Sequence, residues 1–69
     1  MRLSARNQLK GKIVEVRKGV VTASVKVDVG GGNTITSIVS LDAVEELGLE
    51  PGKETTVVIK ATEVMLGVA

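Results

Sequence analysis

Residues 21–29 alternate strictly between apolar and polar side chains, and this alternation constrains the fold more than any other feature of the sequence. Valine or alanine occupies every odd position of the segment, and a polar residue occupies every even one. Successive side chains of a strand point to opposite faces, so the pattern predicts a half-buried β-strand in which Val21, Ala23, Val25, Val27 and Val29 share the buried face.

Further β-type segments flank this strand. Residues 9–16 predict a strand with a bulge or bend at Gly11, and residues 17–19 predict the turn that follows it. Residues 30–33, with the sequence GGGN, predict a hairpin connection into a β-branched strand over residues 34–40. A phosphate-binding loop would need these glycines to lead into a helix, so the hairpin is the favoured interpretation.

A short helix of about two turns is predicted after residue 40. Ser40 is a suitable N-cap, while Leu41, Val44 and Leu47 share one face at a spacing of three residues. Gly48 suits the position that ends a helix in a left-handed conformation.

The last third of the chain predicts a turn at residues 50–52, followed by two closing strands at residues 55–60 and 62–68 that join around Ala61. The element order is then three strands, a short helix and two strands. We therefore predict an all-β fold, an OB-like five-stranded Greek-key barrel with one short helix between strands 3 and 4. Residues 1–69 are expected to form a single domain.

The composition favours an oligomer. A chain of 69 residues buries little of its surface, and this one has no aromatic residue to add buried area and no cysteine to form a disulfide. Because association is a common way to stabilise so small a domain, we expect copies of the chain to assemble, with a marginally stable monomer as the alternative.

Charge and residue types exclude several functions. The net charge is +1 and the charges are scattered, which argues against a nucleic-acid or membrane partner, as does the lack of aromatic residues for base stacking. Without histidine, cysteine or paired carboxylates, neither an enzyme nor a metal-cation site is expected. Neither a secretion signal nor a membrane-spanning segment is recognisable, so a cytoplasmic location is expected.

Hydrogen-bond donors, by contrast, are well supplied. Arg6 and Lys60 are cationic donors, Ser4 and Ser40 carry hydroxyl groups, and backbone N–H groups lie free at the start of the predicted helix. Such donors suit a small oxyanion, which offers only acceptors. Two solvated surface side chains are the alternative interpretation of Arg6 and Lys60.

Four segments together resemble one known family over essentially the whole chain. They are SARNQLKGKIVEV, VTASVKVDV, ITSIVSLDAVEELGLEPGKE and VVIKATEVML, and they resemble the Mop family of small molybdate-binding proteins. The resemblance implies an OB-like fold and the binding of molybdate, with tungstate as a close mimic, for cytoplasmic storage or homeostasis. It also implies a hexamer built as a trimer of dimers, in which partners exchange the N-terminal strand and bind anions between subunits.

The resemblance further implies which residues form the anion site. Carried over position by position, the principal site consists of Ser4, Arg6, Ser40, the backbone N–H of Ala43, and Lys60. A second type of site, on a threefold axis, would involve Lys18 and Gly19. We expect the carboxylate of Asp42 to point to solvent, because it would repel a bound dianion.

A second function stays open from the sequence, namely an oligomerising module that senses its ligand for a transport or transcription partner. Members of the Mop family with that role are fused to other domains, whereas this sequence starts at Met1 and has only 69 residues. On this ground storage or homeostasis is the favoured interpretation.

Overall fold

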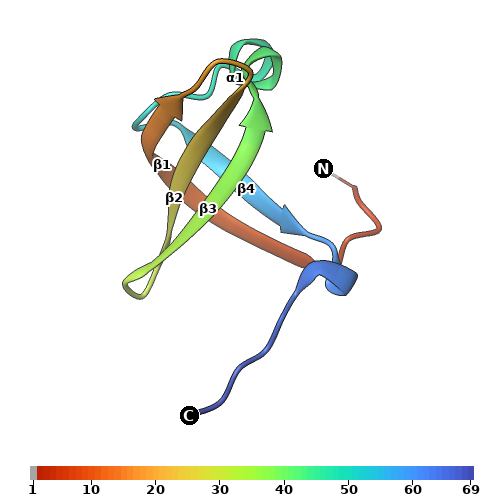
Figure 1. The fold of residues 1–69 in the computed structure, drawn as a ribbon. Helices are drawn as coiled ribbons and strands as arrows, with labels where there is room; N and C mark the ends of the chain where they lie inside the picture. Colours follow the sequence, from red (N-terminus) through yellow and green to blue (C-terminus); the bar gives the residue numbers. More distant parts are fainter. Residues whose placement is uncertain (1) are drawn as a thin grey trace.

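Four antiparallel strands form the sheet of the computed structural model, which describes residues 2–69 (Figure 1). Met1 belongs to the expected single domain but lies outside the described residues. The strand order is β3-β2-β1-β4, so the last strand pairs with the first. The elements are β1 (Asn7–Lys18), β2 (Thr22–Gly30), β3 (Asn33–Ser40), α1 (Leu41–Leu47), β4 (Glu54–Ile59) and a 3-10 helix, η1 (Ala61–Glu63).

The core lies on one face of the sheet and is made of aliphatic side chains. Ile13 of β1 is 1% exposed and packs with Val25 and Val27 of β2, each 3% exposed. The alternation predicted for β2 is thereby confirmed over its central positions. It is wrong for Val21, which is 72% exposed because it lies in the turn before β2, where its carbonyl accepts a hydrogen bond from the N–H of Leu41.

Strand β1 has different partners in its two halves. Asn7 to Lys12 pair with β4, whereas Lys12 to Lys18 pair with β2, so that Lys12 has a partner on each side. The β1–β2 register shifts between Ile13 and Glu15. The irregularity in β1 is therefore at Val14 and not at Gly11, where the sequence had predicted a bulge.

Gly11 is required for a different reason, because β2 passes very close to β1 at this residue. A Cβ atom at this position would lie 2.6 Å from the carbonyl oxygen of Asp28 and 2.6 Å from Cγ1 of Val27. We expect Gly11→Ala to lower the free energy of unfolding by on the order of 1 kcal/mol or more, because β1 and β2 would have to separate. Thermal denaturation measures this effect, with Gly67→Ala as the control, since no atom lies within 4 Å of a Cβ at Gly67. Equal stability of the two variants would contradict the argument.

The helix α1 has the predicted bounds and caps. Oγ of Ser40 accepts a hydrogen bond of 3.1 Å from the N–H of Ala43, and Gly48 ends the helix with a left-handed φ of 62°. Val44 is buried at 4% exposure, as expected for the apolar face. Leu47, placed on the same face by the sequence, is 60% exposed. A seven-residue helix thus anchors to the sheet mainly through its middle turn.

Two further predictions from the sequence are wrong. The first turn is displaced toward the C-terminus, because β1 continues through Lys18. The strand expected at residues 62–68 is absent: η1 follows β4 instead, and residues 64–69 pair with no strand of the described chain. Figure 1 shows this C-terminal segment leading away from the sheet. A strand needs the edge of another strand to pair with, and residues 64–69 do not lie along one. The barrel of the described chain therefore stays open between its two edge strands, β3 and β4.

Candidate functional site

Three of the predicted site residues lie at one end of the sheet. The last residue pair of β1 and β4 is Asn7 with Ile59, and the side-chain amide of Asn7 donates a 3.3 Å hydrogen bond to the carbonyl of Ile59. Arg6 and Lys60 are the next residues outward on the two strands, and Ser4 precedes them. All three predicted side chains are exposed. The β1–β4 pairing therefore brings Arg6 and Lys60 to the same end of the sheet, and Ser4 precedes Arg6 by two residues in the chain.

The two cations of this group have no carboxylate partner within the part of the chain that the structure describes. The ion pairs found there join Glu15 to Arg17 at 4.0 Å and to Lys26 at 3.8 Å, on β1 and β2. Arg6 and Lys60 thus present two positive charges and their N–H donors outward at the same end of the sheet. The group offers what a dianion with acceptor atoms requires.

The other predicted residues lie at the opposite end of β1. Ser40 pairs with Thr22 on β2, and the neighbouring Ala23 pairs with Lys18, the last residue of β1. The 12 residues of β1 span eleven steps of about 3.3 Å, so about 36 Å, measured along the strand, lies between this end and the end next to Arg6. One chain therefore does not bring Ser40 and Ala43 together with Ser4, Arg6 and Lys60.

At the Ser40 end, part of the donor set is already engaged. The N–H of Ala43 donates to Oγ of Ser40, while the hydroxyl hydrogen of Ser40 stays available as a donor. Lys18 and Gly19 lie at this same end, and the N–H of Gly19 closes the β1–β2 turn on the carbonyl of Thr22 at 2.8 Å. Asp42 is exposed, as expected.

The cap hydrogen bond gives a prediction about stability. Ser40→Ala is expected to lower the free energy of unfolding by about 1 kcal/mol, because the N–H of Ala43 loses its acceptor. Ser40→Thr keeps a hydroxyl oxygen at the cap and should stay close to the unsubstituted chain. Thermal denaturation of the two variants measures the difference, and equal destabilisation in both would show that the cap is not what Ser40 contributes.

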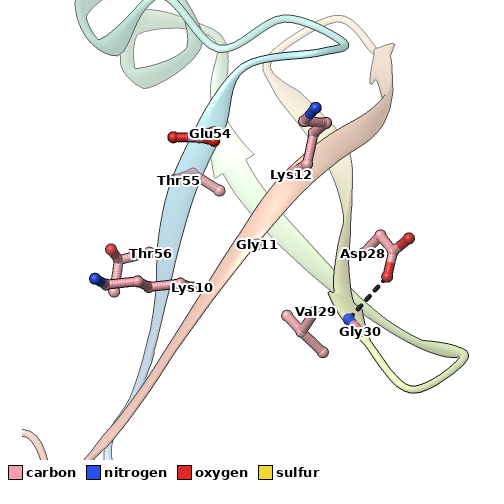
Figure 2. A pocket seen from close by; sticks show the side chains of 9 residues that line it. All are labelled: Lys10, Gly11, Lys12, Asp28, Val29, Gly30, Glu54, Thr55 and Thr56. Atoms are coloured by element: carbon pink, nitrogen blue, oxygen red, sulfur yellow. Dashed lines mark hydrogen bonds between the residues drawn. The ribbon is translucent and has the colours of Figure 1, made fainter.

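A further hollow lies elsewhere, on the β1–β4 surface beside the β2–β3 hairpin. It encloses about 720 Å³ and is lined by Lys10, Gly11, Lys12, Asp28, Val29, Gly30, Glu54, Thr55 and Thr56 (Figure 2). Lys12 stands between Glu54 on β4 and Asp28 on β2 in the strand register. The two lysines that line the hollow are therefore balanced by two carboxylates, Asp28 and Glu54. This open hollow lacks the excess positive charge of the end that carries Arg6.

The sequence did not single out this hollow, and it gives no local signal for it. Its lining comes from β1, β2 and β4, and a mixture of lysine, acid and threonine is ordinary on a solvated strand face. Among residues 2–69, no cluster of three or more carboxylate, histidine or cysteine side chains could hold a metal ion. No helix in this range is both long enough and apolar enough to span a membrane.

Comparison with known proteins identifies the family to which the chain belongs. The TOBE domain model matches residues 3–66. Molybdenum-pterin-binding protein 1 of Clostridium pasteurianum is 62% identical over 66 residues, which cover 96% of this chain and 97% of that protein.

Solved structures agree in fold. MopII from Clostridium pasteurianum superposes with a TM-score of 0.91 at 60% identity, covering 97% of this chain and all of that one. The cytoplasmic molybdate-binding protein ModG, in a form with molybdate bound, superposes with a TM-score of 0.95 at 49% identity, and this chain spans 49% of its length. With its mostly β fold, its matching length and the SARNQ segment at its N-terminal end, the chain belongs to the TOBE domain family and, within it, to the molybdenum-pterin-binding (Mop) proteins.

Proposed function

We propose that this protein binds molybdate, with tungstate as a close mimic, at sites between copies of the chain, and that it serves molybdenum storage or homeostasis in the cytoplasm. The observation that carries the proposal is the pair of cations, Arg6 and Lys60, which lie without carboxylate partners at one end of the β1–β4 pair. Two relatives support the choice of anion: one is named a molybdenum-pterin-binding protein, and the other, ModG, a molybdate-binding protein.

The chemistry of the donor set fits a fully deprotonated oxyanion. Such an anion only accepts hydrogen bonds, and Ser4, Arg6 and Lys60 supply hydroxyl, guanidinium and ammonium donors. Charge-assisted hydrogen bonds of this kind are about twice as strong as neutral ones. Of these three side chains only the Ser4 hydroxyl can also accept a hydrogen bond, so the O–H of a protonated phosphate would be poorly matched, which favours molybdate over phosphate.

The second half of the proposed site is the helix start of another copy. Ser40 would donate its hydroxyl hydrogen, and the anion would replace Oγ of Ser40 as the acceptor of the N–H of Ala43. The separation of Ser40 from Arg6 along β1 supports a site shared between subunits. The same proposal includes a hexamer that is built as a trimer of dimers. It also includes a further anion site at Lys18 and Gly19, on the threefold axis of that hexamer.

The proposed role is binding without a catalytic step. The relatives are named for what they bind, and the sequence has no histidine or cysteine to act as a general base or nucleophile. The domain that binds is expected to comprise residues 1–69 as one unit.

Isothermal titration calorimetry with molybdate tests the function. We expect saturable heat when molybdate is titrated into micromolar protein. Phosphate should compete little for the site. Sulfate, which has the same charge as molybdate but is smaller, tests whether the site discriminates by the size of the anion. No heat with molybdate would overturn the proposal. Displacement of bound molybdate by an equal concentration of phosphate would contradict the argument from donor chemistry.

A further inference from the structure

Two consecutive residues at the start of β1 use their side-chain amides to hold backbone carbonyl groups. Nδ2 of Asn7 donates a hydrogen bond of 3.3 Å to the carbonyl oxygen of Ile59, and Nε2 of Gln8 donates one of 3.0 Å to the carbonyl oxygen of Ala5. The other side-chain hydrogen bonds in the described part of the chain stabilise the β2–β3 turn and the two ends of α1. The amides of Asn7 and Gln8 serve neither a hairpin nor a helix, so they need another explanation.

The two carbonyl groups belong to the peptide units that lead into the cations of the proposed anion site. The carbonyl of Ala5 forms the peptide bond to Arg6, and the carbonyl of Ile59 forms the peptide bond to Lys60. Because a peptide unit is planar, a hydrogen bond that orients its carbonyl also orients the bond to the next Cα atom. The two amides therefore restrain the backbone from which the side chains of Arg6 and Lys60 extend.

The segment before β1 depends on this restraint, because no strand pairing holds it. Strand β1 pairs with β4 only from Asn7 onward, and the chain bends at Ser4 and at Arg6. Figure 1 shows the N-terminal segment turning away from the line of β1 where the strand begins. Unpaired chain ends usually fray. The hydrogen bond from Gln8 back to Ala5 closes the bend across Arg6 and opposes such fraying.

We propose that Asn7 and Gln8 are positioning residues of the anion site. Their amides order the backbone beside the two cations before the anion binds, and neither side chain contacts the anion itself. Affinity gains from this order, because the anion then does not have to immobilise the backbone when it binds. The inference rests on the proposed function, and it gives a role to the two residues of the SARNQ segment that the predicted site leaves unused.

A neutral amide is the side-chain group that suits this role. A carbonyl oxygen only accepts hydrogen bonds, so the restraint requires a donor, and asparagine and glutamine supply an NH2 group without adding charge. An ionised aspartate or glutamate would have no proton to donate. Its negative charge would also offset the attraction of Arg6 and Lys60 for a dianion. The residue types at positions 7 and 8 thus meet both requirements of a site for an anion.

The variant Gln8→Met tests the proposal, since methionine is similar in length to glutamine and has no donor. Gln8 is exposed, so the variant should keep its Tm. Calorimetry is expected to show a Kd for molybdate about tenfold higher, because binding must then order the backbone of residues 4–6. Heteronuclear NOE values of the Ala5 and Arg6 amides should fall in the variant without molybdate and recover when molybdate is added. A residue that contributed only to global stability would not change local order at constant Tm.

Asn7→Leu is the second variant, and Asn33→Leu is its matched control. Leucine resembles asparagine in shape and lacks its donor. Asn33 is exposed and pairs with Gly30 at the β2–β3 turn, whereas the part of β1 that begins at Asn7 pairs with β4. Asn7→Leu is expected to raise the Kd for molybdate by a factor of about ten as well. Asn33→Leu should leave it unchanged.

Three results would overturn the positioning role. They are an unchanged Kd in both Gln8→Met and Asn7→Leu, unchanged NOE values at Ala5 and Arg6 in Gln8→Met, and an equal loss of affinity in Asn33→Leu. The proposed function fails on a different result, which is the absence of heat when molybdate is added to the unsubstituted protein. That result would remove both proposals, whereas the first three would leave the proposed function standing.

Discussion

Lys60→Ala is expected to weaken molybdate binding by about 2 kcal/mol or more, a factor of roughly 30 in Kd, and Arg6→Ala by a similar amount. Each substitution removes a charged donor from a site that has only two cations, both without carboxylate partners in the described chain. The remaining donors would then hold a dianion with one balancing charge. Calorimetric titration of the purified variants measures the change.

Lys26→Ala is the matched control for this experiment. Its side chain is 46% exposed, lies 3.8 Å from Glu15, and belongs to the middle of β2, away from both halves of the proposed anion site. Loss of this charge alters the net charge by the same amount and should leave Kd nearly unchanged. An equal weakening in all three variants would indicate long-range electrostatics, and unchanged affinity in Lys60→Ala and Arg6→Ala would place the anion elsewhere.

Ile13→Ala is expected to lower the free energy of unfolding by about 2–5 kcal/mol. Ile13 is the largest side chain that is fully buried, and it contacts the core of β2 from the centre of β1. Truncation to alanine would leave a cavity in a small core that contains no aromatic side chain to fill it. Thermal denaturation at fixed protein concentration should show a fall in Tm of about 8 °C or more.

The neighbouring residue provides the control for the core substitution. Val14 is 50% exposed and lies at the register irregularity of β1, so Val14→Ala removes apolar atoms without opening a buried cavity. We expect its effect on Tm to be much smaller. Comparable losses of stability at residues 13 and 14 would mean that the face of β1 turned to the core has been assigned wrongly, or that the assembly buries Val14.

The central part of the fold follows from local signals in the sequence. Alternation specifies a strand face through contacts two residues apart, so Ala23, Val25 and Val27 are correctly placed. The caps of α1 depend on residues within one turn, and Ser40 and Gly48 act as predicted. Both features are short-range, which is why inspection of the chain suffices to find them.

The closing strand could not be predicted in this way, because its pairing partner decides whether it forms. Residues 62–68 have the composition of a strand, and yet in the described chain they contain the end of η1 and an unpaired segment. The close approach at Gly11 was missed for a related reason. It depends on where Asp28 and Val27 pass in space, and nothing near Gly11 in the sequence indicates that.

The candidate site, too, has one part that the sequence predicts and one part that it does not. Donor chemistry indicates an anion. The resemblance to the Mop family implied that Arg6 and Lys60 meet through strand exchange between chains, whereas in the structure the β1–β4 pairing within one chain brings them to the same end of the sheet. That Ser40 and Ala43 lie far from them along β1 is a fact of strand register, and no local pattern reveals it. The same register makes a second copy necessary for the site as proposed.

The division of β1 between two partners has a consequence for folding kinetics. Strands β1, β2 and β3 are joined by short turns and pair with their sequence neighbours, so their loops close at small entropic cost. The hydrogen bond from Asn7 to Ile59 spans 52 residues, so formation of the β1–β4 pair requires closure of a long loop at a larger entropic cost. The meander is therefore expected to form early and β4 to dock late, so that the ends carrying Arg6 and Lys60 meet only in the last stage of folding.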